Sequence, residues 1–248
     1  MEPHWEPLGG GLRVLIGGGH GFNTDTLLLA DFSQPKPGAR CADLGSGCCV
    51  IPLLWCHRAR PGPVLALEVQ EEALELARAS IAANGMEGRI TPIHGDIRDY
   101  KSLLPHQSLD MTASNPPYFA PGTGAVSRDS QRSRARHSPT FQLADLADAA
   151  FYSLRHGGRL CLCLPASRLA EAVSLFHSRG LEPKRLRLVQ QRPGREPYLF
   201  LLECRKGGGS GLAVEETLML ADGSGGYSPE MQRIYGDYLD LQKGARHA

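Results

Sequence analysis

Apolar and polar residues form two alternating kinds of segment from about residue 39 onward. Short, continuous apolar runs are typical of buried strands, and stretches with an apolar residue at every third or fourth position are typical of amphipathic helices. The predicted strands are Arg40–Leu44, Pro63–Glu68, Arg89–His94, Ser108–Ser114 and Arg159–Leu164. The predicted helices are Val50–Arg58, Glu71–Ala83, Thr140–Leu154 and Ser167–Ser178.

The alternation of strands and helices predicts a parallel sheet that is covered by helices on both faces. Two further predicted strands, near Arg185–Gln190 and Tyr198–Cys204, are close enough in sequence to pair as an antiparallel hairpin, a common addition to such a sheet. Together these segments predict an α/β, Rossmann-like domain over residues 39–206 with a mixed seven-stranded sheet.

Two segments lie outside this alternation. Residues 1–38 contain the apolar run LRVLI, a run of glycines and the stretch GFNTDTLLLADF, and they predict an N-terminal β-hairpin-like extension. Residues 207–248 begin with the glycine-rich stretch GGGSG and continue with polar sequence. This composition favours a flexible or loosely attached tail.

Composition narrows the class of protein only in part. The formal net charge of +1 supplies no overall field, so a nucleic-acid partner would need a local positive patch. The start, MEPHWEPLGGG, lacks the basic and apolar regions of a signal peptide, and no apolar run approaches the length of a bilayer span. We therefore expect a soluble cytoplasmic protein with no membrane partner. The seven cysteines include no C-x-x-C pair, which favours reduced, buried thiols over disulfides or a metal site.

Acidic residues follow three successive predicted strands. Asp43 opens the turn Asp-Leu-Gly-Ser-Gly, Glu68 ends the second strand, and Asp96 follows the third, just before Ile97. Ligands of open parallel sheets lie beyond the carboxyl ends of the strands, and glycines such as Gly45 and Gly47 let the backbone approach a ligand closely. At such an end, Glu68 can bind both hydroxyls of a ribose and Asp96 can accept a hydrogen bond from an adenine amino group.

The identity of this nucleoside ligand follows from charge and from one missing glycine. A dinucleotide fingerprint requires a third glycine where this chain has Val50, and Asp43 would repel a pyrophosphate. S-adenosyl-L-methionine carries a sulfonium and an α-ammonium group and no phosphate. An acid-rich pocket therefore predicts S-adenosyl-L-methionine as the cofactor.

The fourth predicted strand leads directly into Asn115, Pro116, Pro117 and Tyr118, followed by Phe119. An amino group conjugated to a base or an amide is a poor nucleophile because its lone pair is delocalised. The Asn115 side-chain oxygen and the Pro116 carbonyl can each accept one of its N–H groups and aim the lone pair at a methyl group. Tyr118 or Phe119 can offer a flat face to the substrate. A rigid turn without chemistry is the alternative for an isolated Asn-Pro-Pro.

These motifs together resemble the small-domain class I methyltransferases that act on planar amino nitrogens. The stretch GFNTDTLLLADF is similar to the N-terminal signature of the bacterial valine-tRNA methyltransferases, which methylate N6 of the adenine next to the anticodon. The resemblance implies that Asn115 and Tyr118 hold the base, with Asn115 also close to the nucleoside. It also implies a cofactor pocket formed in part by the N-terminal extension and lined by Thr24, Asp25, Asp43, Gly45, Ser46, Gly47, Glu68, Asp96 and Ile97.

A basic stretch, SRDSQRSRARHS, follows this motif. It contains four arginines that could meet RNA phosphates beside an extruded base, Arg128, Arg132, Arg134 and Arg136. A solvated surface loop is an equally good interpretation of such a stretch taken alone.

The sequence thus favours an S-adenosylmethionine-dependent enzyme that methylates N6 of an adenine in RNA, most simply tRNA. A protein glutamine N5-methyltransferase would use the same Asn-Pro-Pro-Tyr, but such enzymes usually carry a helical domain before the cofactor motif. A DNA adenine methyltransferase normally needs a target-recognition insertion. An NAD(P)-dependent oxidoreductase is disfavoured by Val50, and a non-catalytic RNA-binding relative by the intact motifs.

Overall fold

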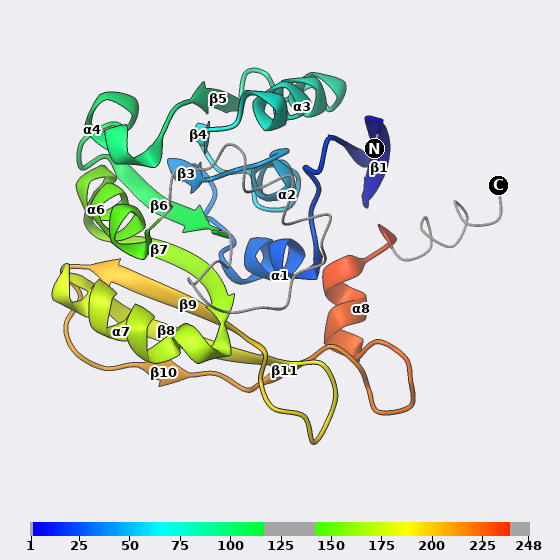
Figure 1. Ribbon diagram of the computed structural model, residues 1–248, viewed down its shortest axis with the longest axis vertical. Coiled ribbons are helices and arrows are strands. Elements are labelled where there is room, and N and C mark those ends of the chain that lie inside the picture. Colours follow the sequence, from blue (N-terminus) through cyan, green and yellow to red (C-terminus); the bar gives the residue numbers. More distant parts are fainter. Residues whose placement is uncertain (1, 117–141, 239–248) are drawn as a thin grey trace.

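The computed structural model describes residues 2–116 and 142–238, and a nine-stranded mixed sheet runs through its centre (Figure 1). Seven strands make up its main body: β3 (Cys41–Leu44), β4 (Val64–Glu68), β5 (Ile90–His94), β6 (Leu109–Ser114), β7 (Leu154–Pro165), β8 (Leu181–Gln190) and β9 (Leu199–Lys206). Two short strands extend the edge: β10 (Ala213–Val214) and β11 (Leu218–Met219).

The order of the strands places the predicted motifs on one rim. The sheet runs β10-β8-β9-β7-β6-β3-β4-β5, and β11 also pairs with β8. Strands β3 to β7 are mutually parallel, whereas β9 is antiparallel to both β7 and β8. The predicted Rossmann-like sheet and its terminal antiparallel hairpin are confirmed. The predicted number of seven strands is short by two, because β10 and β11 come from the tail.

Helices cover both faces of the sheet (Figure 1). One face packs against α1 (Thr24–Phe32), α2 (Val50–Arg58) and α3 (Glu71–Ala83). The other packs against α4 (Tyr100–Leu103), α6 (Leu143–Ser153) and α7 (Leu169–Ser178). Two short 3-10 turns precede α4 and α7, η1 (Ile97–Asp99) and η2 (Ala166–Arg168).

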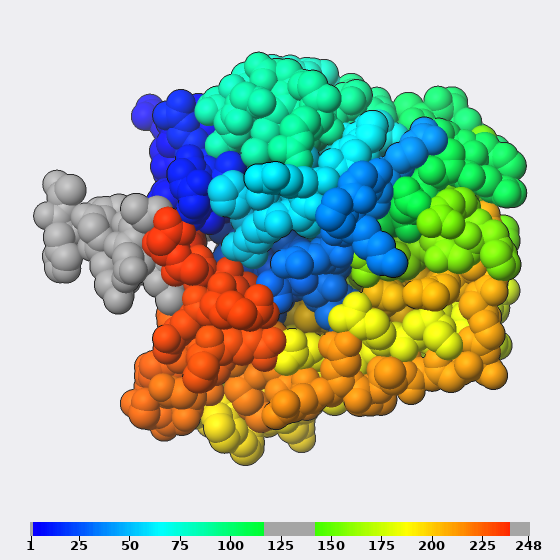
Figure 2. All heavy atoms as spheres, turned by 180° about the vertical axis from the view of Figure 1, so that it is seen from behind, coloured from blue at the N-terminus to red at the C-terminus, as the bar shows by residue number. Residues whose placement is uncertain are grey.

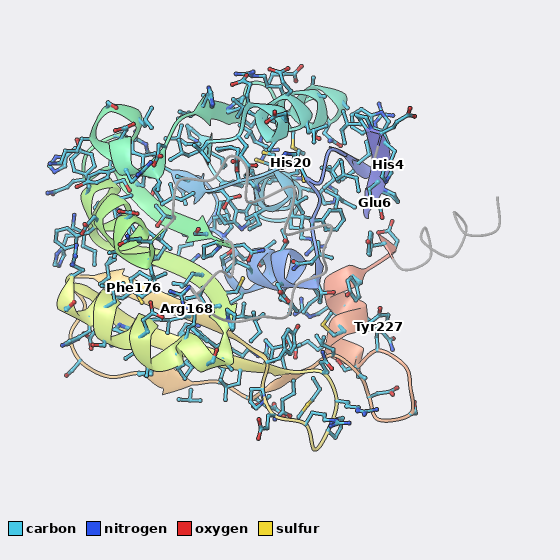
Figure 3. The ribbon with its side chains drawn as sticks, viewed as in Figure 1. His4, Glu6, His20, Arg168, Phe176 and Tyr227 are labelled. Atoms are coloured by element: carbon cyan, nitrogen blue, oxygen red, sulfur yellow. The ribbon has the colours of Figure 1, made fainter. Side chains whose placement is uncertain are left out.

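Successive residues of the central strands contribute to opposite cores, as the period of two in a strand requires. In β7, Cys161 and Cys163 pack with the α1 side, and Leu160 and Leu162 pack with the α6 side. All seven cysteines are buried, which confirms their interpretation as small core residues. Phe176 of α7, labelled in Figure 3, is fully buried in the core on the α6 side of the sheet.

The N-terminal extension begins as a separate two-stranded antiparallel sheet of β1 (His4–Gly9) and β2 (Leu12–Ile16). The hairpin is attached to α3, because Ser80 Oγ accepts a hydrogen bond from Leu15 N at 2.9 Å and Asn84 Oδ1 accepts one from Arg13 N at 3.2 Å. The predicted hairpin-like form is therefore observed in residues 4–16.

The tail departs from the sequence expectation. Residues 207–238 contain β10, β11 and α8 (Pro229–Tyr235), and Met231 and Ile234 of α8 are buried in the core shared with α1 and α2. From behind, the red end of the tail lies beside the blue N-terminal residues (Figure 2). The prediction of a loosely attached tail is wrong for these residues, because apolar positions spaced along α8 bind it to the domain.

Among the described residues, no helix is long and apolar enough to cross a bilayer. The same part of the chain contains no cluster of three or more His, Cys, Asp or Glu side chains suited to a metal ion.

Candidate active site

The turn after β3 opens the rim of the sheet. Gly45 and Gly47 have φ angles of +86° and +53°, in the region that favours glycine. A Cβ atom added to either glycine would meet no atom within 4 Å, so both face open space. The Gly45 and Ser46 amides donate to Leu67 O at 2.9 Å, which holds the turn against the end of β4.

Asp43 lies at the base of this turn with 1% of its surface exposed. Its Oδ1 atom, like the buried Ser46 Oγ, has no hydrogen-bond partner among the described residues. Burial, and secondarily the nearby charge of Glu68, raise the pKa of the Asp43 carboxyl from 3.8 to about 8. A buried acid of this kind is stabilised in its charged form by a neighbouring cation.

Glu68 occupies the end of β4, as predicted, but its carboxylate already has backbone partners. Oε1 accepts hydrogen bonds from Val69 N and Gln70 N at 2.9 Å, and Oε2 accepts one from Gly47 N at 2.8 Å. The side chain therefore joins the glycine turn to the end of β4. Because each carboxylate oxygen can accept two hydrogen bonds, Oε2 can accept a second one from a ribose hydroxyl. Ribose binding by Glu68 therefore stays a prediction.

Asp96 caps η1 by accepting a hydrogen bond from Arg98 N at 2.9 Å. The Arg98 guanidinium also contacts both of its carboxylate oxygens, at 3.0 and 2.6 Å. Hydrogen bonding from Arg98 lowers the pKa of Asp96. Asp96 and the half-buried Ile97 lie on the predicted rim, but an adenine amino group would share the Asp96 carboxylate with Arg98.

Thr24 and Asp25 lie in the first turn of α1, and the side chain of each contacts a residue from a distant part of the chain. Thr24 Oγ1 lies 2.9 Å from the hydroxyl of Tyr235 in α8. Asp25 is buried, and its Oδ1 accepts a hydrogen bond from the Tyr198 hydroxyl at 3.2 Å. Burial, and then the charge of Asp25, raise the pKa of Tyr198, so Tyr198 acts as the donor. Tyr198 and Tyr235, both distant in sequence, thus hold Asp25 and Thr24 in place.

Asn115 follows β6 at the middle of the rim and is half-buried. Its Nδ2 donates to Thr26 Oγ1 at 3.0 Å, and its Oδ1 accepts from Cys163 Sγ in β7 at 3.1 Å. Asn115 is therefore held between α1 and β7. An amide oxygen accepts two hydrogen bonds, so the contact with Cys163 is compatible with a second one from a substrate.

The orientation of the Asn115 amide follows from fixed donors and acceptors on α1. Asn23 caps the helix, and its Oδ1 must face the backbone N–H of Thr26, which donates at 3.1 Å. The Thr26 hydroxyl donates its single proton to the same Oδ1, also at 3.1 Å. Thr26 Oγ1 is then left to accept, so the Asn115 NH₂ group faces α1 and its oxygen faces the other way.

Sequence reasoning missed several of these contacts. The Asn-Thr-Asp sequence before an apolar run was itself a helix-capping signal, which could have identified Asn23 and Thr26. No local signal pointed to Cys163, Tyr198 or Tyr235, which reach the site only through strand pairing and tail packing. The remaining predicted residues lie outside the described part of the chain: Pro117, Tyr118, Phe119, Arg128, Arg132, Arg134 and Arg136.

The described residues fit S-adenosylmethionine. Asp43 presents a buried carboxyl oxygen without a partner, which suits a cationic ammonium group. The glycines of the turn leave open space where a Cβ would stand, which suits close approach of a ligand. Glu68 and Asp96 follow β4 and β5 on the same rim, and the first turn of α1 contacts Asn115 and Tyr198.

Comparison with known proteins identifies the class to which this protein belongs. Residues 21–131 match the family described as "Methyltransferase small domain", and the protein is a methyltransferase. A Porphyromonas gingivalis protein named tRNA1(Val) (adenine(37)-N6)-methyltransferase is 33% identical over 222 residues, 85% of each chain. The protein of the same name from Tolumonas auensis is 30% identical over 87% of this chain and 88% of its own. The chain belongs to the family of the tRNA1(Val) (adenine(37)-N6)-methyltransferases.

Solved structures agree on the fold. A predicted O-methyltransferase, protein Atu636 from Agrobacterium tumefaciens, matches with a TM-score of 0.70 at 22% identity, covering 87% of this chain and 97% of that one. TrmN from Thermus thermophilus matches with a TM-score of 0.51 at 23% identity, covering 73% of this chain and 48% of that one. At these identities the likeness supports the Rossmann-like fold alone.

Proposed function

We propose that this protein transfers a methyl group from S-adenosylmethionine to N6 of an adenine in tRNA, at the position next to the anticodon. The observation that carries the proposal is the held amide of Asn115, at the middle of the rim that also bears Asp43, Glu68 and Asp96. The names of the relatives support tRNA as the substrate.

The chain's own residues perform the positioning. The Asn115 oxygen accepts one N–H of the adenine amino group, and the Pro116 carbonyl accepts the other. This pair reduces delocalisation of the nitrogen lone pair and aims it at the methyl carbon, a near-attack geometry. When bound, S-adenosylmethionine supplies an electrophilic methyl group. The amino nitrogen held by Asn115 and Pro116 would accept this methyl group, with the cofactor's thioether as the leaving group, and would release one proton to solvent.

Asp43 and the glycine turn have the binding role. The buried Asp43 carboxylate holds the α-ammonium end of the cofactor, directly or through a water molecule, and becomes charged as it does so. The Gly45–Gly47 backbone allows the nucleoside to approach, and Glu68 holds the turn and accepts from the ribose. Asn115 then separates the cofactor half of the rim, over β3 to β5, from the half over β7 to β9.

The direct test is methyl transfer from labelled cofactor to total tRNA, total protein and DNA in parallel, followed by nucleoside analysis. We expect label in tRNA as N6-methyladenosine. The Asn115→Ala variant should lose transfer while its affinity for S-adenosylmethionine stays close to that of the wild type. Label in protein glutamine or in DNA, with none in tRNA, would replace the proposal with one of those substrates.

A further inference from the structure

The turn between β8 and β9 lies on the same rim as Asn115. The register pairs Leu199, at the start of β9, with Pro165 at the end of β7 and with Val189 near the end of β8. Because β8 and β7 both run antiparallel to β9, their carboxyl ends meet at one edge. The turn of residues 191–198 therefore projects from the edge that carries the active-site residues.

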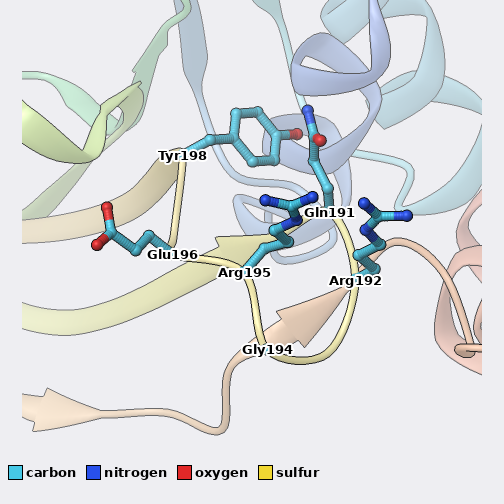
Figure 4. A pocket seen from close by; sticks show the side chains of 6 residues that line it. All are labelled: Gln191, Arg192, Gly194, Arg195, Glu196 and Tyr198. Carbon is cyan, nitrogen blue, oxygen red and sulfur yellow. The ribbon is translucent and has the colours of Figure 1, made fainter.

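A hollow of about 570 Å³ is formed by this turn (Figure 4). This volume is within the range of small-ligand sites and is sufficient for one nucleotide. Gln191, Arg192 and Arg195 rise on the same side of the turn next to Tyr198, whereas the Glu196 carboxylate points away from them (Figure 4). The lining residues are Gln191, Arg192, Gly194, Arg195, Glu196 and Tyr198.

The two arginines of the hollow are exposed, and neither has an ion pair or a side-chain hydrogen bond within the described residues. The neighbouring basic residues of β8 differ. Arg185 pairs with Glu203 and Glu215 at 2.8 and 2.7 Å, and Arg187 pairs with Glu230 at 2.6 Å. Arg192 and Arg195 are therefore positive charges with no acidic partner in the part of the chain that the structure describes.

The hollow is connected to the candidate active site. Tyr198 lines it and donates its hydroxyl proton to Asp25 at the start of α1, one residue before Thr26, which holds Asn115. Strands in a sheet lie about 4.8 Å apart, and β9 and β8 are two and three strands from β6, so the turn lies about 10–14 Å from Asn115. It also lies on the side of Asn115 opposite to Asp43 and Glu68.

We propose that this hollow is a subsite for a nucleotide flanking the target adenosine, in which Arg192 and Arg195 bind the RNA phosphates. The proposal rests on the RNA substrate proposed above. Arginine suits the role because its planar guanidinium group donates two parallel hydrogen bonds to a phosphate. A phosphate here holds the strand so that an adenine extruded from its stack reaches Asn115.

The test is the affinity of the Arg192→Ala/Arg195→Ala variant for tRNA at several salt concentrations. Each phosphate contact to a single strand contributes about 0.7 to the slope of log affinity against log salt, so the slope should fall by about 1.4. At 0.1 M salt this corresponds to about 25-fold weaker binding. The KM for tRNA should rise, while kcat at saturating tRNA and the affinity for S-adenosylmethionine stay near wild type.

Two further variants control the experiment. Arg40→Ala/Arg205→Ala removes two exposed charges from the opposite rim, one residue before β3 and near the end of β9, and should leave the slope unchanged. Arg192→Lys/Arg195→Lys retains the charge and should restore most of the slope.

The outcomes separate this subsite from the function on which it rests. If the wild type does not methylate RNA, the proposed function fails. If the wild type does, and the Arg192→Ala/Arg195→Ala variant keeps both its slope and its affinity, only the subsite is wrong. An equal loss in the opposite-rim variant would likewise overturn it, because net charge rather than position would then explain the effect.

Discussion

At the scale of the residue, the site depends on one buried acid and one held amide. Asp43 is buried with a raised pKa of about 8, and Asn115 is held by groups on α1 and β7. In the proposed function, the first residue pairs with the cationic end of the cofactor, and the second directs the reacting amino group. Each arrangement makes a separate prediction.

We expect cofactor binding near pH 7 to release close to one proton. With a pKa of about 8, Asp43 is mostly protonated at this pH, and a nearby ammonium group favours its charged form, so binding expels the proton. Calorimetry in two buffers of different ionisation enthalpy measures the number released. The Asp43→Asn variant should release none and bind more weakly. Binding by the wild type without proton release would contradict the pairing.

The same shift affects the stability of the cofactor-free protein. The pKa of Asp43 is higher in the folded chain than its ordinary value of 3.8, so the folded state binds more protons between these two values. The contribution of Asp43 to the free energy of unfolding is therefore largest at low pH and is lost as the pH rises toward 8. The pH dependence of urea unfolding should be flatter in Asp43→Asn.

Thr26 should act as a positioning residue for Asn115. Thr26→Val keeps the shape of the side chain but removes the acceptor that faces Asn115 Nδ2, so the amide loses its fixed orientation. We expect kcat to fall about fivefold, the equivalent of one hydrogen bond of about 1 kcal/mol, with little change in the cofactor Kd. Thr26→Ser keeps the hydroxyl and should restore kcat. Equal turnover by Thr26→Val and wild type would show that the amide is held by other contacts.

At the scale of the element, α8 fastens the tail to the domain. Its Arg233 forms a bidentate ion pair with Asp31 of α1, at 2.9 and 2.8 Å, and Tyr235 contacts Thr24. Figure 3 shows Tyr227 beside α8, and the rings of Tyr227 and Tyr235 lie 5.0 Å apart. The tail therefore supports the same first turn of α1 that carries Asp25 and Thr26.

Truncating a buried side chain of α8 should destabilise the whole domain. Ile234 is 1% exposed, and Ile234→Ala should lower the free energy of unfolding by about 2–5 kcal/mol. Gln232→Ala in the same helix removes an exposed side chain with one hydrogen bond, to Tyr227 O at 2.8 Å, and should change it by no more than about 1 kcal/mol. Urea denaturation measures both. Equal stability of the two variants would mean that α8 does not pack on the core in solution.

Most boundaries of the elements were predictable, because they depend on local periodicity. Helices α2 and α3 begin and end at the predicted residues, and β4 and β6 differ by one residue at the start. Strand β7 begins at Leu154 rather than Arg159, because the chain passes from α6 into the strand without a break through Gly157 and Gly158. Leu154 pairs with Leu109 and Arg159 pairs with Met111, so residues 155–158 form a bulge within β7, in which Gly157 has a φ angle of +77°.

At the scale of the whole molecule, cofactor binding and folding should be coupled. The proposed pocket lies at the ends of β3 and β4, and the first turn of α1, which contacts Asn115, is held by the tail through Tyr235. A ligand at 100 times its Kd stabilises the folded state by about 2.7 kcal/mol. We therefore expect S-adenosylmethionine to raise the Tm by about 5–10 °C. NAD at equal concentration should leave the Tm unchanged, and a larger shift with NAD would overturn the assignment of the cofactor.

The sequence by itself determined the order of the elements and the rim on which the motifs lie. Strand and helix periods, capping residues and glycine turns act over a few neighbouring residues, so they can be recognised without the fold. Since the carboxyl ends of parallel strands share one edge, the positions of Asp43, Glu68, Asp96 and Asn115 followed from the same reasoning.

Only the tertiary structure decided which groups these residues contact. Several hydrogen bonds of the site depend on how side chains from separate segments pack. They join Glu68 to Gly47, Asp96 to Arg98, and Asn115 to Thr26 and Cys163. The same is true of the tail, whose glycines indicated freedom although its later apolar residues are buried in the core. Hydrogen-bond partners distant in sequence have no local pattern, because close packing rather than chain proximity brings them together.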